Sequence, residues 1–201
     1  MKPVTAVIFD VANVIVDWDA GRALVGAVPD EQVRAFLASD TFWDINARTD
    51  AGMPLSEGLA EFERTDADLA AVYRTYLERF PLTVTGPIPG TAEVIEELLA
   101  AGVPCFGLSN WAAENFHIAR AANPVLDRLA DVIVSGEVGM AKPDPDIFRF
   151  ALRRFGLDAS TTVMIDDTQV NLVSAETVGL PTLHFTSAER LRRDLVGLGL
   201  L

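Results

Sequence analysis

Polar residues capable of chemistry follow several apolar runs in this chain. The first run, residues 4–9, is rich in β-branched and aromatic side chains and leads directly into Asp10. Later runs lead to Ser109 and Asn110, to the loop that carries Lys142, and to Asp166 and Asp167. A carboxylate at the end of a buried strand requires a cation, hydrogen bonds or a chemical role, because burying an unpaired charge is costly. These positions are therefore the candidate functional residues.

Three of these positions carry carboxylates that would need a positive charge between them. Asp10, Asp166 and Asp167 would otherwise repel one another, and their pKa values would rise. Oxygen ligands without a histidine or cysteine cluster suit a hard cation, so Mg²⁺ is the expected cofactor. A hydroxyl, an amide and the Lys142 ammonium beside that ion would suit a dianionic phosphate group.

Strand-like runs alternate with helical patterns along most of the chain. Strands are predicted at residues 4–9, 103–108, 132–134, 162–165 and 181–185, and helices at 91–101, 112–122, 145–155, 169–178 and from 188 onward. This alternation predicts an α/β fold, a Rossmann-like parallel sheet sandwiched by helices. Ligands of such sheets bind outside the carboxyl ends of the strands, so the candidate residues are expected to share one crevice.

Residues 20–80 interrupt the alternation, because helical patterns alone are found there. Asp30 and Ser56 are suitable N-caps, and residues 65–68 resemble a capping box. We therefore expect a Rossmann-like catalytic core at residues 1–18 and 86–201, with a small all-helical cap at residues 19–85 inserted after the first strand. The glycines and prolines of residues 86–90 predict a hinge or turn.

Composition excludes several classes of protein. The chain has 201 residues, of which 50% are hydrophobic, and its net charge of −13 argues against a nucleic-acid partner. No apolar run approaches the roughly 20 residues needed to span a bilayer, and no signal-peptide pattern is present at the N-terminus, so no membrane association is expected. The lone Cys105 fits a reducing compartment, which predicts a cytoplasmic location. The oligomeric state does not follow from the sequence.

The motifs, in this order, resemble the haloacid dehalogenase-like (HAD) hydrolase superfamily. The resemblance covers essentially the whole chain and is carried by Phe9-Asp10-Val11-Ala12-Asn13-Val14, Leu108-Ser109-Asn110, Lys142-Pro143, and Ile165-Asp166-Asp167 with Asn171. The first motif is followed directly by a helical insert. In this form it is most similar to the first motif of the branch that includes glucose-1-phosphate phosphatases and the N-terminal domains of some epoxide hydrolases.

This resemblance implies a Mg²⁺-dependent phosphatase of small phosphorylated metabolites, sugar phosphates among them. Asp10 would be the nucleophile and would form an aspartyl-phosphate that water then hydrolyses. Ser109 and the amides around Asn110 would hold the phosphoryl oxygens, and Lys142 would stabilise the developing charge. Metal ligands would come from Asp10, the carbonyl oxygen of Ala12, and the carboxylates of Asp166 and Asp167. Asp167 is favoured as the direct ligand, with Asp166 bound directly or through water.

Ala12 departs from the pattern of most phosphatases of this superfamily. They carry a second aspartate, a general acid and base, two residues after the nucleophile, whereas a methyl group cannot transfer a proton. General acid catalysis typically contributes about 10²–10⁴-fold to the rate. The named branch also lacks this aspartate, so phosphatase activity stays compatible with Ala12.

Two other functions stay open. A 2-haloacid dehalogenase resembles this chain at Asp10, Ser109, Asn110 and Lys142, but it needs no metal and has fewer acidic groups in the last motif. The pair Asp166-Asp167 therefore favours the phosphatase. The third alternative is a weakly active or non-catalytic protein that keeps the HAD fold.

The predicted cap offers three candidates for the upper wall of a substrate pocket. Trp43, Arg48 and Asp50 fall in one helical stretch. Packing within the cap accounts for Trp43, and Arg48 is the predicted substrate-binding and specificity residue.

Overall fold

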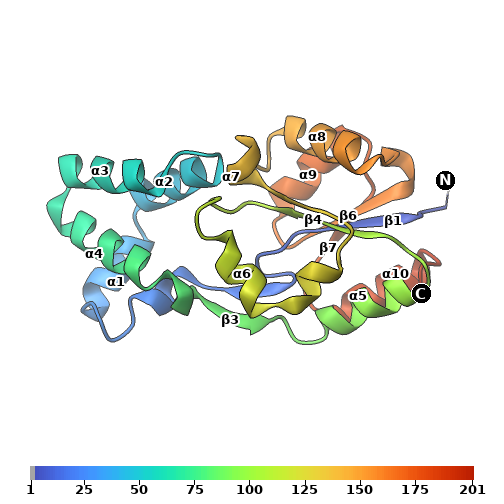
Figure 1. Cartoon of the computed structure of the whole chain (residues 1–201), viewed down its shortest axis with the longest axis horizontal. Coiled ribbons are helices and arrows are strands. Elements are labelled where there is room, and N and C mark those ends of the chain that lie inside the picture. Colours follow the sequence, from blue (N-terminus) through green and yellow to red (C-terminus); the bar gives the residue numbers. More distant parts are fainter. Residues whose placement is uncertain (1–2) are drawn as a thin grey trace.

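The computed structural model describes residues 3–201. Residues 1 and 2, which the sequence analysis assigns to the start of the catalytic core, lie outside this range. Figure 1 shows a group of helices at one end of the molecule and a sheet between helices at the other. Within the described range, no helix is both long and apolar enough to cross a membrane.

A parallel sheet of five strands organises the described chain, in the order β5-β4-β1-β6-β7. Its strands are β1 (Ala6–Phe9), β4 (Cys105–Ser109), β5 (Val132–Val134), β6 (Thr162–Asp166) and β7 (Thr182–His184). The central strand β1 lies between β4 and β6, where Ile8 is opposite Phe106 on one side and Met164 on the other. All four residues of β1 are buried, as expected for a strand covered on both faces.

Helices cover both faces of this sheet. On one face, Ile8 and Met164 pack with the apolar sides of α8 (Pro145–Phe155) and α9 (Gln169–Thr177). The alternate residues Val7 and Phe9 belong to the second core, together with apolar residues of α5 (Thr91–Ala100), α6 (Phe116–Ala122) and α10 (Ala188–Gly197). Because successive strand residues point to opposite faces, the apolar run of β1 contributes to both cores. The predicted α/β sandwich is confirmed.

Four helices between β2 and β3 form the far end of the molecule (Figure 1). They are α1 (Asp30–Leu37), α2 (Asp40–Asp50), α3 (Leu55–Thr65) and α4 (Ala67–Glu78). Their shared core is aromatic: the Phe36 and Phe42 ring centroids are 4.2 Å apart, and those of Phe62 and Tyr73 are 4.9 Å apart. This segment also contains the short 3₁₀-helices η1 (Ala20–Ala23) and η2 (Phe80–Thr83).

A two-stranded antiparallel ribbon connects the helical segment to the sheet, and the sequence analysis did not predict it. It consists of β2 (Val16–Trp18) and β3 (Val84–Pro87), with Trp18 opposite Val84. Part of the stretch 86–90, expected to be a hinge or turn, is thus a strand. Each strand is short and its partner is distant in sequence, so local patterning could not reveal the pairing.

The helix predicted from residue 112 begins later, at Phe116. Residues 111–113 instead lie against α7 (Ser135–Val138), where the Gly136 amide donates to the Trp111 carbonyl oxygen at 3.1 Å. A Cβ atom at Gly136 would lie 2.5 Å from the Ala113 nitrogen. This close backbone approach holds the segment in a non-helical loop, and that loop borders the site described next.

Candidate active site

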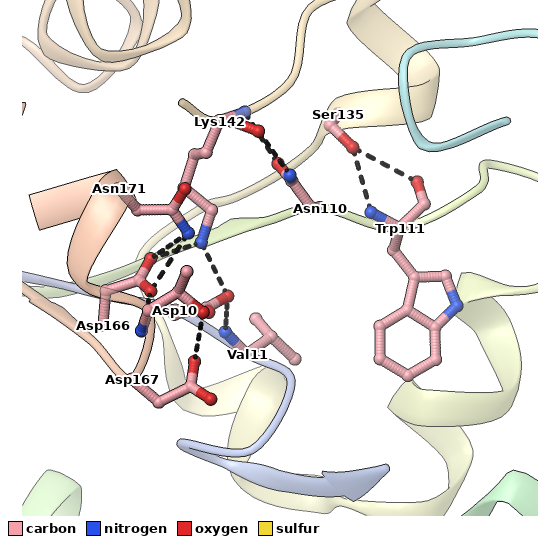
Figure 2. A network of polar contacts seen from close by, with 10 residues as sticks. Asp10, Val11, Asn110, Trp111, Ser135, Lys142, Asp166, Asp167 and Asn171 are labelled. Carbon is pink, nitrogen blue, oxygen red and sulfur yellow. Dashed lines mark hydrogen bonds and ion pairs between the residues drawn. The ribbon is translucent and has the colours of Figure 1, made fainter. Parts of the chain in front are cut away.

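The candidate residues converge at the carboxyl edge of the sheet. Ser109 ends β4. Asp10 follows β1, Asp166 ends β6, and Lys142 lies in the loop after α7 (Figure 2). β1 is hydrogen-bonded to both β4 and β6, so their ends are adjacent although the residues are far apart in sequence. The structure therefore brings together the residues of all four motifs.

A buried ammonium lies between two buried carboxylates. Lys142 Nζ is 2.8 Å from Asp10 Oδ1 and 2.7 Å from Asp166 Oδ2, and these three side chains are 8% exposed or less. The Val11 amide also donates to Asp10 Oδ1, at 2.6 Å. Hydrogen-bonded and ion-paired in this way, the buried charges compensate one another.

Burial and neighbouring charges shift the pKa values of Asp10, Lys142 and Asp167. Burial raises the pKa of Asp10 to about 7; the Lys142 charge opposes the shift, and the nearby Asp166 and Asp167 add to it. Burial alone would lower the pKa of Lys142, but the carboxylates of Asp10 and Asp166 outweigh it and raise that pKa. The pKa of Asp167 is raised by burial and by repulsion from Asp166. A cation at this position would favour the ionised form of all three carboxylates.

The carboxylates of Asp10, Asp166 and Asp167 form a group that can hold a metal ion. One oxygen atom from each lies within 4.8 Å of the others. Three carboxylate oxygens without nitrogen or sulfur ligands fit a hard divalent cation such as Mg²⁺. The residues present therefore fit the cofactor expected from the sequence.

Asp166 and Asp167 differ in how far their oxygens are already used. Asp166 accepts a hydrogen bond from the Thr168 amide at 2.8 Å. Both of its carboxylate oxygens also accept from Asn171 Nδ2, each at 3.1 Å, and one of them contacts Lys142. The partly exposed Asp167 accepts from the Thr168 hydroxyl at 3.3 Å. Asp166 is thus fixed within the protein, while Asp167 retains more capacity for a metal or water.

Asn110 holds the backbone of the loop that carries Lys142. Its Nδ2 donates to the Lys142 carbonyl oxygen at 2.7 Å, and its Oδ1 accepts from the Lys142 amide at 2.8 Å (Figure 2). This reciprocal pair fixes the position of Lys142 relative to β4. The Asn110 side chain therefore orients the lysine, a role that the sequence analysis did not predict.

Ser109 Oγ is buried and has no hydrogen-bond partner among the described residues. An unpaired buried hydroxyl is unfavourable in a folded protein unless a ligand or water completes it. Its location at the end of β4, next to β1 and Asp10, makes it a candidate donor to an oxygen of a bound anion.

A tight turn after Asp10 directs the chain away from the sheet. Asn13 has φ of 57°, a left-handed conformation that asparagine tolerates better than most residues. Its amide donates to the Val16 carbonyl oxygen at 2.7 Å, and its Oδ1 accepts from the Trp18 amide at 3.1 Å. This turn positions residues 10–12 at the sheet edge and begins the ribbon.

A pocket lies between this edge and the helical segment. It has a volume of about 90 Å³ and is lined by Ala12, Trp18, Trp43, Asn46, Thr49, Asp50, Leu55, Tyr73, Tyr76, Phe80, Asn110, Trp111, Ala112 and Asn115. Trp43 and Asp50, noted in the sequence as candidates, are in this set. The tyrosines and Asn46 could not be assigned to it from sequence, because helical periodicity does not show which face a helix turns to the core.

The structure does not bring Arg48 into the pocket. Its guanidinium pairs with Glu61 at 2.7 Å and Asp44 at 3.2 Å, beside a separate surface hollow that also includes Met53 and Arg64. Arg48 and Asp50 are two positions apart on α2, so they point to different sides of the helix. The side that faces the pocket carries Asn46 and Asp50, which are hydrogen-bonded at 3.1 Å.

Comparisons with known proteins agree with this geometry. The family model for haloacid dehalogenase-like hydrolases matches residues 4–179. The chain is 24% identical to sesquiterpene phosphatase astK from Aspergillus oryzae, over 91% of the chain and 90% of that protein. It is 28% identical to probable phosphatase IndB from Dickeya dadantii, over 92% of the chain and 82% of that protein.

Solved structures show the same fold. A HAD family enzyme from Bacteroides thetaiotaomicron superposes with a TM-score of 0.76 at 17% identity, over 96% of this chain and 99% of that one. A structure of the same enzyme in complex with magnesium and inorganic phosphate has a TM-score of 0.69, at 17% identity and over 92% and 95% of the two chains. With its fold, its four motifs and a family match over most of its length, the chain belongs to the haloacid dehalogenase-like hydrolases.

Proposed function

We propose that the protein is a Mg²⁺-dependent phosphatase of small phosphate monoesters that works through an aspartyl-phosphate intermediate. The observation that carries this proposal is the arrangement of three carboxylates around a buried lysine at the sheet edge. The phosphatases among its relatives, and the magnesium and phosphate held by the Bacteroides thetaiotaomicron enzyme, support it.

Each residue would have a distinct role. An oxygen of Asp10 attacks phosphorus, the bond to the ester oxygen breaks, and the alcohol departs with a proton. Water then attacks the phosphorus of the aspartyl-phosphate, which releases inorganic phosphate and restores the Asp10 carboxylate. Ser109 and the backbone amides beside Asn110 hold the phosphoryl oxygens, while Lys142 stabilises negative charge on them and on Asp10.

The metal site would use Asp10, the carbonyl oxygen of Ala12, and Asp167, with Asp166 held close by its own hydrogen bonds. Mg²⁺ bound there would neutralise charge on the nucleophile and the transferring phosphoryl group. The greater availability of the Asp167 oxygens supports its assignment as the direct ligand.

The alcohol part of the substrate would be uncharged. Among the described residues that line the pocket, six are aromatic and none is lysine, arginine or histidine, so a second anionic group would find no counter-charge. Sugar phosphates fit this class, because the apolar faces of a sugar pack on aromatic rings. A terpenoid alcohol, as the name of the Aspergillus oryzae relative indicates for that protein, also fits.

A metal-dependence assay with two substrates tests the proposal. We expect hydrolysis of an aryl phosphate that requires Mg²⁺ and stops in excess chelator, with no chloride release from chloroacetate. The Asp10→Asn variant should lose essentially all activity, since an amide is a far poorer nucleophile than a carboxylate. Chloride release without metal would instead identify a dehalogenase, and inactivity on both substrates would favour a non-catalytic protein.

A further inference from the structure

The proposed reaction lacks a proton donor at the position where many HAD phosphatases have one. Ala12 carries a methyl group there, yet an alkoxide is a poor leaving group unless it is protonated as it departs. In an in-line displacement the leaving oxygen lies on the side of phosphorus opposite the attacking oxygen. Attack by Asp10 from the sheet edge therefore directs the leaving oxygen toward the pocket beneath the helical segment.

Asp50 is the one carboxyl group among the described residues that line this pocket. The other titratable groups in the lining are the phenols of Tyr73 and Tyr76. Burial and the nearby Asp50 charge raise the pKa of both phenols above the usual value. They are therefore weaker acids than a free tyrosine, which leaves Asp50 as the candidate donor.

The last residue of α2, Asp50, is held at the loop that follows Ser109 and Asn110. Its carboxylate accepts from Asn46 Nδ2 at 3.1 Å. The Ala112 amide of that loop lowers the pKa of Asp50 and so favours its ionised form. The Asn46 bond leaves lone pairs of the carboxyl oxygens free for a substrate.

The surroundings of Asp50 favour a carboxyl group that carries a proton near neutral pH. Burial raises its pKa to about 7, against the opposing effect of the Lys142 charge. Tyr73 and Tyr76 on α4 lie close enough for the Asp50 charge to raise their pKa values, and Glu114, whose Oε1 accepts from the Leu55 amide at 3.2 Å, acts on Tyr73 in the same way. A donor is most effective when its pKa lies near the working pH.

We propose that protonated Asp50 donates its proton to the departing alcohol oxygen and so replaces the acid absent at position 12. The proton passes from the Asp50 carboxyl to the ester oxygen as the bond between that oxygen and phosphorus breaks. The products are the neutral alcohol, the aspartyl-phosphate on Asp10 and the Asp50 carboxylate. Asp50 then recovers a proton from the water that attacks the intermediate. This inference rests on the proposed phosphatase function.

Leaving-group dependence in an Asp50→Asn variant tests the proposal. Asparagine has nearly the same shape and can still accept a hydrogen bond from Asn46, but it cannot supply the proton. Turnover of an alkyl phosphate should fall by about 10²–10³-fold, within the range for general acids. Aryl phosphate turnover should fall far less, because a phenolate leaves without protonation. Asp44→Asn is the matched control: it lies on the same helix, and its side chain is 66% exposed.

Two further readouts separate proton donation from a structural role. In the wild type, alkyl turnover should decline as pH rises above the pKa of Asp50, and this decline should be absent in Asp50→Asn. Ala12→Asp, introduced into the Asp50→Asn variant, should restore alkyl turnover at least ten-fold.

An equal loss on alkyl and aryl substrates would overturn the proposal, because it would mean that Asp50 only ties the helical segment to the loop at Ala112. Any other result in which Asp50→Asn has the same ratio of alkyl to aryl turnover as the wild type would overturn it as well. The proposed function fails separately, if wild-type aryl hydrolysis is independent of Mg²⁺ or of Asp10.

Discussion

At the scale of single residues, the site depends on how charge is divided among buried groups. Lys142 compensates Asp10 and Asp166 together, and Asp166 is further fixed by Asn171 and the Thr168 amide. Asp167 takes part in fewer of these bonds. We therefore propose different functions for the two adjacent acids: Asp166 would orient the lysine, and Asp167 would bind the metal.

Replacement of Asp167 by asparagine should abolish the response to Mg²⁺ without unfolding the protein. The amide removes a negative charge from the proposed metal site, while the bonds of Asp166 and Lys142 stay in place. We expect Mg²⁺-stimulated turnover to fall by at least about 10²-fold, because a bound metal ion contributes several kcal/mol of charge stabilisation in the transition state. We also expect Mg²⁺ to raise the melting temperature of the wild type but not that of Asp167→Asn, since ligand binding to the native state stabilises it.

The control for this variant is Asp146→Asn, which changes an exposed carboxylate on α8 that pairs with Arg149. It should respond to Mg²⁺ as the wild type does. Full activity of the wild type in excess chelator, or an unchanged Mg²⁺ response in Asp167→Asn, would contradict the assignment of the metal site.

At the scale of elements, the helical segment from η1 to η2 contacts the sheet domain through both apolar and polar groups. Apolar residues of the two parts belong to one buried core. The Leu55 amide donates to Glu114, the Ala112 amide acts on Asp50, and the rings of Phe80 and Trp111 are 6.1 Å apart. The β2-β3 ribbon supplies the covalent connection. Two covalent links through one ribbon are the arrangement in which a cap can move as a unit over the pocket by hinge closure.

We predict that residues 19–85 form a mobile cap that closes when the phosphate site is filled. Closure would exclude water from the aspartyl-phosphate and complete the pocket around the alcohol. Hydrogen exchange with and without beryllofluoride and Mg²⁺ measures this. Amides at the end of α2 and the start of α3 should exchange more slowly in the presence of the analogue, while those of the buried strand β1 serve as the internal reference. Identical exchange in this segment would count against closure.

At the scale of the whole molecule, two carboxyl groups with raised pKa values should make stability depend on pH. The pKa values of Asp10 and Asp50 are both raised from 3.8 to about 7. Below pH 4 these groups are protonated in both the native and the unfolded state, so they cause no difference. Between about pH 4 and 7 the native state binds more protons than the unfolded state. The free energy of unfolding therefore falls as pH rises through this window.

Denaturant unfolding at pH 5 and pH 8 without Mg²⁺ tests this expectation. We expect the free energy of unfolding to be lower at pH 8 by roughly 2–5 kcal/mol, given about 1.4 kcal/mol for each pKa unit and partial solvent screening. Saturating Mg²⁺ should reduce the difference, because the ion stabilises the ionised form of Asp10. The Asp50→Asn variant should also show a smaller difference. Stability that is equal or higher at pH 8 without metal would refute the linkage.

The sequence by itself determined the α/β architecture and the place of the four motifs. Alternating apolar runs and helical patterns require a parallel sheet, and the carboxyl ends of parallel strands meet at one edge. Asp10, Ser109 and Asp166 could therefore be placed together without coordinates. The same reasoning gave the three-carboxylate group, since it depends only on which strand each aspartate follows.

Only the tertiary structure decided which residues of the helical segment face the site. Arg48 and Asp50 both lie on α2, but burial of Phe42, Ile45 and Thr49 fixes the rotation of this helix. That rotation places Asp50 in the pocket and Arg48 in ion pairs with Asp44 and Glu61. Helical periodicity is the same for either rotation, so long-range packing had to choose between them. The bond that joins Asn110 to the Lys142 backbone is likewise a tertiary contact, because 32 positions separate the two residues.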